Sequence, residues 1–172
     1  MFTALQRAWR HWEIDRKVRR YGFAGQYVGD YDSYPTWVYT IGFLENLGRP
    51  EVIIFDLPQA EAHWVLWTLY HGLQDGSQRL AEGAVFALED QEVGTFRRVH
   101  PTRVYNHELW LGLAGQRRIR RTGSIEGFDA FQLVLHDPAG RYPWDDGYDT
   151  RPAAATAGAM AGRRGRSRGA CG

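Results

Sequence analysis

The run from Val52 to Phe55 is the feature that most limits the folds open to this chain. Its four residues are all apolar, and three of them are β-branched. A strand with one side in solvent alternates apolar and polar residues, whereas a continuous short apolar run is typical of a strand covered on both faces. The sequence therefore predicts a central strand with further structure packed above and below it.

A helix is predicted directly after this strand. Asp56 and Gln59 have the spacing of a capping box, and Pro58 lies in the first turn, where its missing N–H is harmless. Gly76 is a typical C-terminal stop. The apolar residues between them recur at helical spacing and predict one buried stripe: Ala62, Val65, Leu66, Leu69, Tyr70 and Leu73.

Helix and strand patterns follow one another in mixed order along the rest of the first 150 residues. The predicted helices are 3–20, with an apolar face of Phe2, Leu5, Trp9 and Trp12, and 105–117, weakened at Gly112. The predicted strands are 23–28, 36–43, 85–88, 93–99 and 131–136, of which the first two form a hairpin. This order favours an α+β fold: a single domain with a mixed, mostly antiparallel sheet packed by two or three helices.

The composition changes abruptly after Tyr148. Residues 151–172 are dominated by Ala, Gly and Arg, contain five arginines and no acid, and show no apolar periodicity. Such a segment buries too little apolar surface to fold, so we expect one globular α+β domain over 1–150 and a disordered tail over 151–172. The formal charge of the chain is +1, so the five tail arginines leave the domain at −4.

Several classes of protein are disfavoured by what the chain lacks. Cys171 is its single cysteine, so we expect no disulfide and no thiolate metal site. The first 25 residues lack the pattern of a signal peptide, and no apolar run approaches the ~18 residues needed to span a bilayer. We therefore expect a cytoplasmic protein with no membrane partner.

The common motifs of catalysis are also absent. We find no nucleophile elbow, phosphate-cradling loop, dinucleotide fingerprint or zincin helix. His63 and His71 lie about 12 Å apart along their predicted helix, too far to bind one ion by themselves, so we interpret them with Trp67 as packing or surface aromatics. We predict no metal site and no cofactor.

Two separated segments together resemble a known family. The run Tyr39 to Phe43 (YTIGF), followed by Arg49 to Pro58 (RPEVIIFDLP), resembles the opening signature of the bacterial family called domain of unknown function 4262. The run Gln132 to Trp144 (QLVLHDPAGRYPW) resembles its closing signature. Arg49 stands where that family usually carries His, and Leu135-His136 where it carries Trp-Pro. The resemblance covers about residues 17–148 and implies no established activity.

The two signatures contain polar and aromatic residues that a plain hydrophobic core does not need. We predict that the domain binds a small molecule or a partner protein in a groove between them. The candidate ligand-binding residues are Tyr39, Thr40, Glu51, Gln132, Asp137, Arg141 and Trp144.

Three other interpretations remain open from the residues alone. The first is an enzyme in which Glu51 or Asp137 is the general base and Arg141 stabilises negative charge. The second is that these polar residues only stabilise local structure. The third is nucleic-acid association through the tail, by Arg163, Arg164, Arg166 and Arg168.

Overall fold

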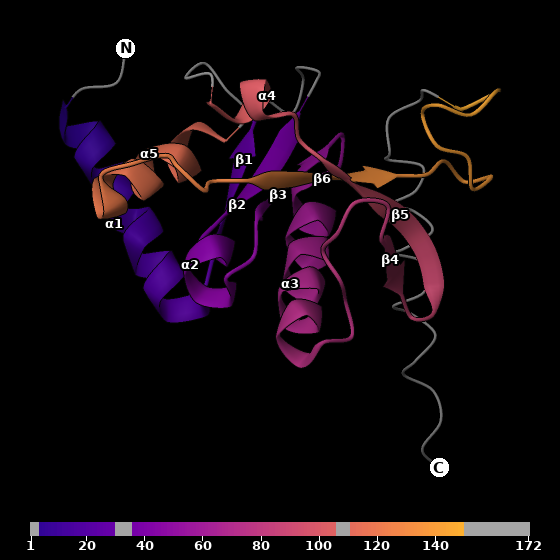
Figure 1. Cartoon of the computed structure of the whole chain (residues 1–172), viewed down its shortest axis with the longest axis horizontal. Coiled ribbons are helices and arrows are strands. Elements are labelled where there is room, and N and C mark those ends of the chain that lie inside the picture. The colour runs from indigo at the N-terminus through magenta and orange to yellow at the C-terminus, as the bar shows by residue number, and fades with distance from the viewer. Residues whose placement is uncertain (1–3, 30–35, 106–110, 150–172) are drawn as a thin grey trace.

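Among the residues that the structure describes, six short strands form one sheet, in the order β1-β2-β3-β6-β5-β4 (Figure 1). The computed structural model describes residues 4–29, 36–105 and 111–149. Strands β3 and β6 are parallel, and the other four neighbouring pairs are antiparallel. The strands are β1 Ala24–Val28, β2 Trp37–Ile41, β3 Glu51–Phe55, β4 Val85–Leu88, β5 Gln91–Arg98 and β6 Ala130–Leu135. The mixed, mostly antiparallel sheet of an α+β fold is confirmed.

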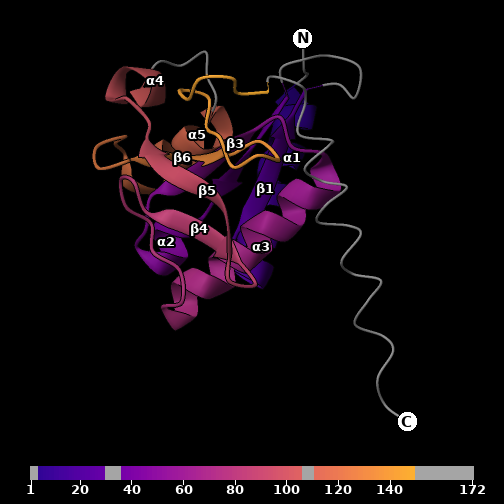
Figure 2. The same cartoon turned by 90° about the vertical axis from the view of Figure 1, so that its right-hand side faces the viewer.

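Helices cover both faces of this sheet, as Figure 2 shows from the side. The residues of α3 belong to the larger apolar cluster on one face. Those of α1 and α5 belong to a second cluster on the other face. The helices are α1 Ala4–Tyr21, α2 Phe43–Leu47, α3 Gln59–Asp75, α4 Pro101–Tyr105 and α5 Gly112–Thr122.

Strand β3 is the centre of the core, as its apolar run predicted. Val52 and Ile54 pack in the cluster beside α3, and Ile53 packs in the cluster beside α1 and α5. All three side chains are fully buried. Because successive side chains of a strand point to opposite faces, an apolar residue at every position is what two covered faces require.

Helix α3 confirms the predicted stripe but not the predicted cap. Ala62, Val65, Leu66, Leu69 and Tyr70 are buried, and Leu73 is partly buried. The N-cap residue is Pro58, with no side-chain cap hydrogen bond, so the predicted capping box is wrong. Asp56 instead has a positive φ of 60°, and its N–H donates to the Thr36 carbonyl oxygen in β-sheet fashion. Gly76 ends the helix in the left-handed conformation, as expected.

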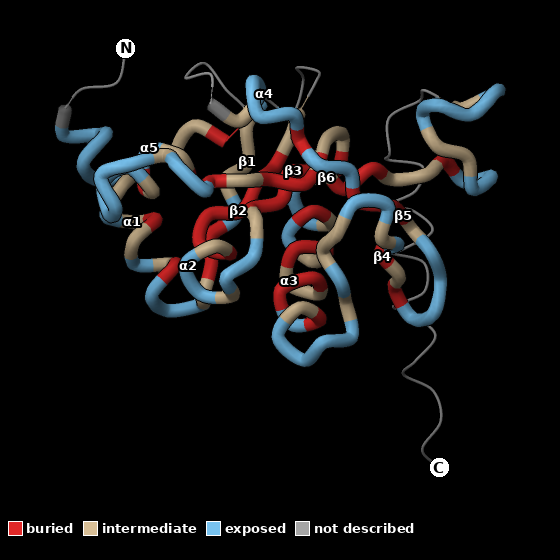
Figure 3. The backbone as a smooth tube through the Cα atoms, in the orientation of Figure 1, coloured by how far each residue is buried: buried red, intermediate tan, exposed pale blue. Residues whose placement is uncertain are grey.

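Helix α1 forms where it was predicted, but its buried face is a different one. Leu5, Trp9 and Trp12 are 83%, 62% and 53% exposed. Ile14 and Val18, one turn apart in the second half of the helix, contact the core instead. Figure 3 shows that the first half of α1 is exposed. Only the second half of the helix packs against the rest of the domain. Phe2 falls outside the described residues.

Two further segments differ from their predicted structure. Strand β2 ends at Ile41, and Phe43 begins the short helix α2 instead of continuing the strand. The predicted helix 105–117 is confirmed only from Gly112 onward, where α5 begins and continues to Thr122, whereas Tyr105 belongs to α4 and residues 106–110 lie outside the described part. Pro101 suits the first turn of α4 because its missing N–H has no partner there in any helix. The residues 30–35, 106–110 and the predicted tail lie outside the described part.

Candidate functional site

Glu51 is a buried carboxylate at the start of β3, and four hydrogen bonds converge on it. Its Oε2 accepts bonds from Thr40 Oγ1 at 2.6 Å and the Phe43 N–H at 3.3 Å. Its Oε1 accepts bonds from the Gly42 N–H at 2.9 Å and the Leu44 N–H at 3.3 Å. The carboxylate therefore accepts hydrogen bonds from the N–H groups at the start of α2. These N–H groups have no acceptor within the helix itself.

The turn between β2 and α2 gives these N–H groups their direction. Gly42 has a φ of 114°, which a residue with a side chain rarely adopts. A Cβ at this position would also lie 2.9 Å from Val18 Cγ1 of α1. Thr40 completes the arrangement, since its hydroxyl donates to Glu51 and accepts the Val52 N–H at 2.8 Å. The YTIGF signature thus encodes a tight strand-to-helix turn around a carboxylate.

The surroundings of Glu51 change its acidity. Burial raises the pKa of Glu51 to about 7, while the bonds from Thr40 and the three backbone N–H groups oppose that rise. The protonated and ionised forms of this side chain are therefore both populated near neutral pH.

A small pocket lies beside Glu51, between the β2–α2 turn and α5. It holds about 210 Å³ of space not filled by atoms, open solvent at its mouth included. Within the described residues, the Nε of Arg118 is buried and has no hydrogen-bond partner. Another nitrogen of the same guanidinium, Nη2, donates to the Glu126 carbonyl oxygen at 3.2 Å. The lining residues are Ile41, Gly42, Leu44, Glu45, Glu51, Ala114, Arg117, Arg118 and Phe128.

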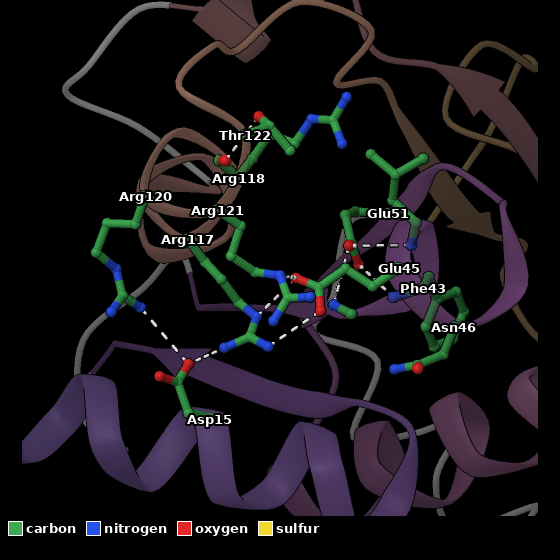
Figure 4. Close-up of polar contacts among 12 residues, drawn as sticks. Asp15, Phe43, Glu45, Asn46, Glu51, Arg117, Arg118, Arg120, Arg121 and Thr122 are labelled. Atoms are coloured by element: carbon green, nitrogen blue, oxygen red, sulfur yellow. Dashed lines mark hydrogen bonds and ion pairs between the residues drawn. The ribbon is translucent and has the colours of Figure 1, made fainter.

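Arg117 ties three helices together at the edge of this pocket (Figure 4). Its guanidinium, 4% exposed, binds Glu45 of α2 through Nε at 2.8 Å and Nη2 at 3.0 Å, and forms an ion pair with Asp15 of α1. Burial and the neighbouring Arg121 and Arg120 lower the pKa of Arg117 to about 10. It remains a cation at neutral pH, which its two carboxylate partners require.

Sequence reasoning did not identify Arg117 or Arg118 as site residues. The available signal was the run Gln116 to Arg121, in which Arg117, Arg120 and Arg121 lie on one helical face. Arg120 and Arg121 reinforce the network, at 3.5 Å from Asp15 and 3.5 Å from Glu45.

Tyr39 and Gln132, two predicted site residues, lie on the sheet near Glu51. Tyr39 is buried, and its hydroxyl oxygen accepts the Leu113 N–H at 3.2 Å. Burial raises the pKa of Tyr39 to about 12, while the bond from Leu113 opposes the rise. Gln132 is partly buried in β6, opposite Ile53 of β3, which itself pairs with Tyr39. Tyr39 is therefore a core residue held by a backbone group.

Asp137 and Arg141 form a closed turn after β6. Oδ1 of Asp137 accepts the Ala139 and Arg141 N–H groups, each at 2.9 Å, and Oδ2 accepts Arg141 Nε at 2.9 Å and the Asp149 N–H at 3.2 Å. Burial acts to raise the pKa of Asp137, but these bonds together lower it. The Gly140 N–H donates to the Asp137 carbonyl oxygen at 2.9 Å, which closes a tight turn over residues 137–140.

Trp144 lies on the surface beyond this turn. It is 53% exposed and stacks on Tyr142, with ring centroids 4.9 Å apart. The Arg97 guanidinium lies 5.0 Å from the centroid of the Trp144 ring. Tyr142 donates to Glu92 Oε1 at 2.6 Å, which anchors the segment to β5. Trp144 therefore packs on its neighbours and does not line the Glu51 pocket.

The predicted single groove between the two signatures is wrong. Glu51 pairs with Ala130 at the start of β6, and Asp137 follows the far end of that strand. Seven residues of extended chain lead from Ala130 to Asp137, so Glu51 and Asp137 lie about 20 Å apart along the strand direction. Figure 1 shows α2 and the segment after β6 at separate ends of the sheet. The structure brings Thr40 and Glu51 together and keeps Asp137, Arg141 and Trp144 away from them.

The His63, Trp67 and His71 group packs as surface aromatics on α3. Trp67 Nε1 donates to His63 Nε2 at 2.8 Å, and His71 stacks on the Trp67 ring with centroids 5.3 Å apart. Among the described residues, no group of three or more His, Cys, Asp and Glu side chains could hold a metal ion. In the same part of the chain, no helix combines the length and the apolar character that crossing a membrane requires.

The fold and the site define an α+β domain whose sheet carries a carboxylate-centred turn at each end of β6. The family described as Domain of unknown function (DUF4262) matches residues 17–149, so this chain belongs to that family. A search of curated proteins and a search of solved structures found no match.

Proposed function

We propose that this domain is a binding module that takes a small anionic group, a carboxylate or a phosphate, in the pocket between α2 and α5. The observation that carries the proposal is made at Arg118, which lines the pocket and whose buried Nε has no hydrogen-bond partner within the described residues. A buried donor left without a partner costs free energy, and an acceptor on a ligand would recover it.

The acceptors of the pocket, in contrast, are already in use. An ionised carboxylate offers about four acceptor sites, and Glu51 receives four hydrogen bonds from the protein. Arg117 occupies both oxygens of Glu45. The hydrogen-bonding capacity left over is that of a donor, which favours a ligand that brings acceptors.

The number of hydrogen bonds that each carboxylate accepts also bears on the alternative that the protein is an enzyme with Glu51 or Asp137 as its general base. A general base needs a free lone pair within hydrogen-bond reach of the proton that it removes. Glu51 and Asp137 both receive four or more N–H or O–H groups, so neither offers one in this conformation. The raised pKa of Glu51 is typical of catalytic acids and bases, but buried structural carboxylates show it too.

The size and charge of the pocket narrow the ligand class. The enclosed space of the pocket is only about 10 Å³, roughly the room that one water molecule needs, so it is far too small for a drug-sized ligand. Helix α5 contributes four arginines and no acid to this side of the domain. One oxygen of a carboxylate or phosphate group matches this space, and the four arginines of α5 outnumber the two lining carboxylates, Glu45 and Glu51.

Titration calorimetry with inorganic phosphate and with acetate tests this proposal on the full chain. The wild type is expected to bind at least one of the two anions. Arg118→Gln is expected to weaken binding by about ten- to a hundredfold, the usual range for a lost hydrogen bond to a charged group. Arg120→Gln, on the same helix but directed to Asp15, is the matched control and should keep the affinity.

Two results would contradict the proposal. One is a wild-type protein that binds neither anion. The other is an Arg118→Gln variant that binds as tightly as the wild type and the Arg120→Gln control.

A further inference from the structure

The outer face of α1 carries exposed apolar residues that the fold does not use. Leu5, Trp9 and Trp12 are 83%, 62% and 53% exposed, and Arg16 follows them at the same helical spacing. We call these four residues the outer stripe. Its spacing of four, three and four residues places the stripe along one side of the helix for about 16 Å.

This stripe lies opposite the side by which α1 binds the domain. Ile14 and Val18 are buried in the core cluster, whereas residues 5–10 are all exposed. Figure 3 shows this first half of α1 projecting beyond the helices and strands around it. Within the described residues the stripe is therefore a convex ridge and not a wall of a groove.

The ridge stands in a strongly positive part of the molecule. Helix α1 holds six Arg and Lys residues and two acids, Glu13 and Asp15. Both acids are already engaged, Glu13 with Lys17 and Asp15 with arginines of α5. Helix α5 adds four arginines and no acid, and three of these arginines share the two carboxylates Asp15 and Glu45. The excess of cations calls for an anionic partner.

We propose that the outer stripe docks this protein on the surface of an anionic membrane. Trp and Leu side chains favour the boundary between head groups and acyl chains, and flanking arginines pair with anionic lipids. The Arg16 guanidinium lies 5.2 Å from the centre of the Trp12 ring, so cation and aromatic ring are already adjacent. Such a surface is flat and deformable, and it accepts a projecting ridge without a matching groove.

Nucleic acid fits the same charges less well. Aromatic rings could stack on unpaired bases, and arginines could pair with phosphates. Leu5, the most exposed of the large apolar side chains in the described residues, would gain little from a sugar–phosphate surface. Lipid accommodates the aliphatic side chain, the two indole rings and the cations together.

This proposal is independent of the pocket between α2 and α5. The family match begins at Lys17, so Leu5, Trp9, Trp12 and Arg16 all precede it. The sequence-based expectation of no membrane partner came from the lack of a spanning segment, and contact with a membrane surface needs none.

Co-sedimentation of the full chain with vesicles tests the proposal. Vesicles of equal parts phosphatidylglycerol and phosphatidylcholine should bind the protein, and phosphatidylcholine alone should bind it far less. The double variant Trp9→Gln/Trp12→Gln should lose binding by about tenfold or more, since its apolar anchors are gone. Trp144→Gln is the matched control, because Trp144 is as exposed as Trp12 but lies beside Asp145 and Asp146.

Three results would overturn the proposal. The wild type could fail to sediment with anionic vesicles, or it could bind neutral vesicles equally well. The double variant could bind as the wild type does. A single-stranded oligonucleotide that binds the stripe, with the same dependence on Trp9 and Trp12, and that displaces the protein from vesicles would assign the stripe to nucleic acid instead.

Discussion

Replacing Glu51 by Gln should remove a pH dependence from the stability of this domain. The pKa of the side chain is about 7 in the fold, against an ordinary value of 4.5. The folded protein therefore holds the proton more tightly than the unfolded chain does. Its contribution is fully favourable below pH 4.5 and is lost as the pH rises through about 7. The shift corresponds to about 3 kcal/mol in the free energy of unfolding.

Urea denaturation of the wild type and of Glu51→Gln, at several pH values between 5 and 8, measures this term. Groups that titrate in both proteins cancel when the two free energies of unfolding are subtracted. The wild type should lose most of about 3 kcal/mol relative to Glu51→Gln as the pH rises across that range. Glu126→Gln, at an exposed glutamate, controls for the loss of one carboxylate.

A difference between wild type and Glu51→Gln that stays constant within about 1 kcal/mol from pH 5 to 8 would refute this reasoning. It would mean that the four hydrogen bonds to Glu51 outweigh burial and keep the carboxylate ionised throughout. The same outcome would strengthen the view that Glu51 is a structural anchor of α2.

Four further substitutions test the packing. Leu66→Ala and Leu69→Ala, both at fully buried positions of α3, should each lower the free energy of unfolding by roughly 2–5 kcal/mol, measured by urea denaturation. Gly22→Ala should destabilise by about 1–3 kcal/mol or more, because φ is 88° and the new Cβ would collide with the Tyr70 hydroxyl; an unchanged melting temperature would contradict this. Arg117→Met should cost about 1.5–3 kcal/mol, since Asp15 and Glu45 lose their buried partner and keep only Arg120 and Arg121, and a loss below about 0.5 kcal/mol would show that the network contributes little.

Local sequence patterns were sufficient to predict an element such as β3, which is covered by apolar residues on both faces. Strand β3 is apolar at Val52, Ile53 and Ile54, so no knowledge of its neighbours was needed to place it in the centre. Helix α1 shows the limit of this reasoning. The large residues Trp9 and Trp12 form the apolar face of the predicted helix, but the buried residues are Ile14 and Val18, whose part of the helix lies over the sheet. Which side of a helix is buried therefore depends on how far the neighbouring elements extend along it.

The candidate site was only partly predictable for a similar reason. Thr40 and Glu51 lie in the opening signature, and the structure joins them by a hydrogen bond of 2.6 Å. Arg117 reaches Glu45 across 72 residues of sequence, and Arg118 lies beside it in the same arginine-rich run. Such contacts come from the packing of α5 on α1 and α2, which no local pattern encodes.

The direction of one strand pair explains why the two signatures do not share a pocket. Glu51 opens β3 and Asp137 follows β6, so an antiparallel pair would have placed them at the same end of the sheet. The pair is parallel, with Glu51 opposite Ala130, and the two carboxylates fall at opposite ends. Each carboxylate has the same structural role, which is to accept the N–H groups of the turn beside it. Glu51 collects the N–H groups of the turn into α2, and Asp137 collects those of the turn that closes on Arg141. Thr40, Glu51, Asp137 and Arg141 of the two signatures are therefore accounted for by two turns at the ends of the sheet. The buried donor on which the proposed function rests, Arg118 Nε, belongs to α5, outside both signatures.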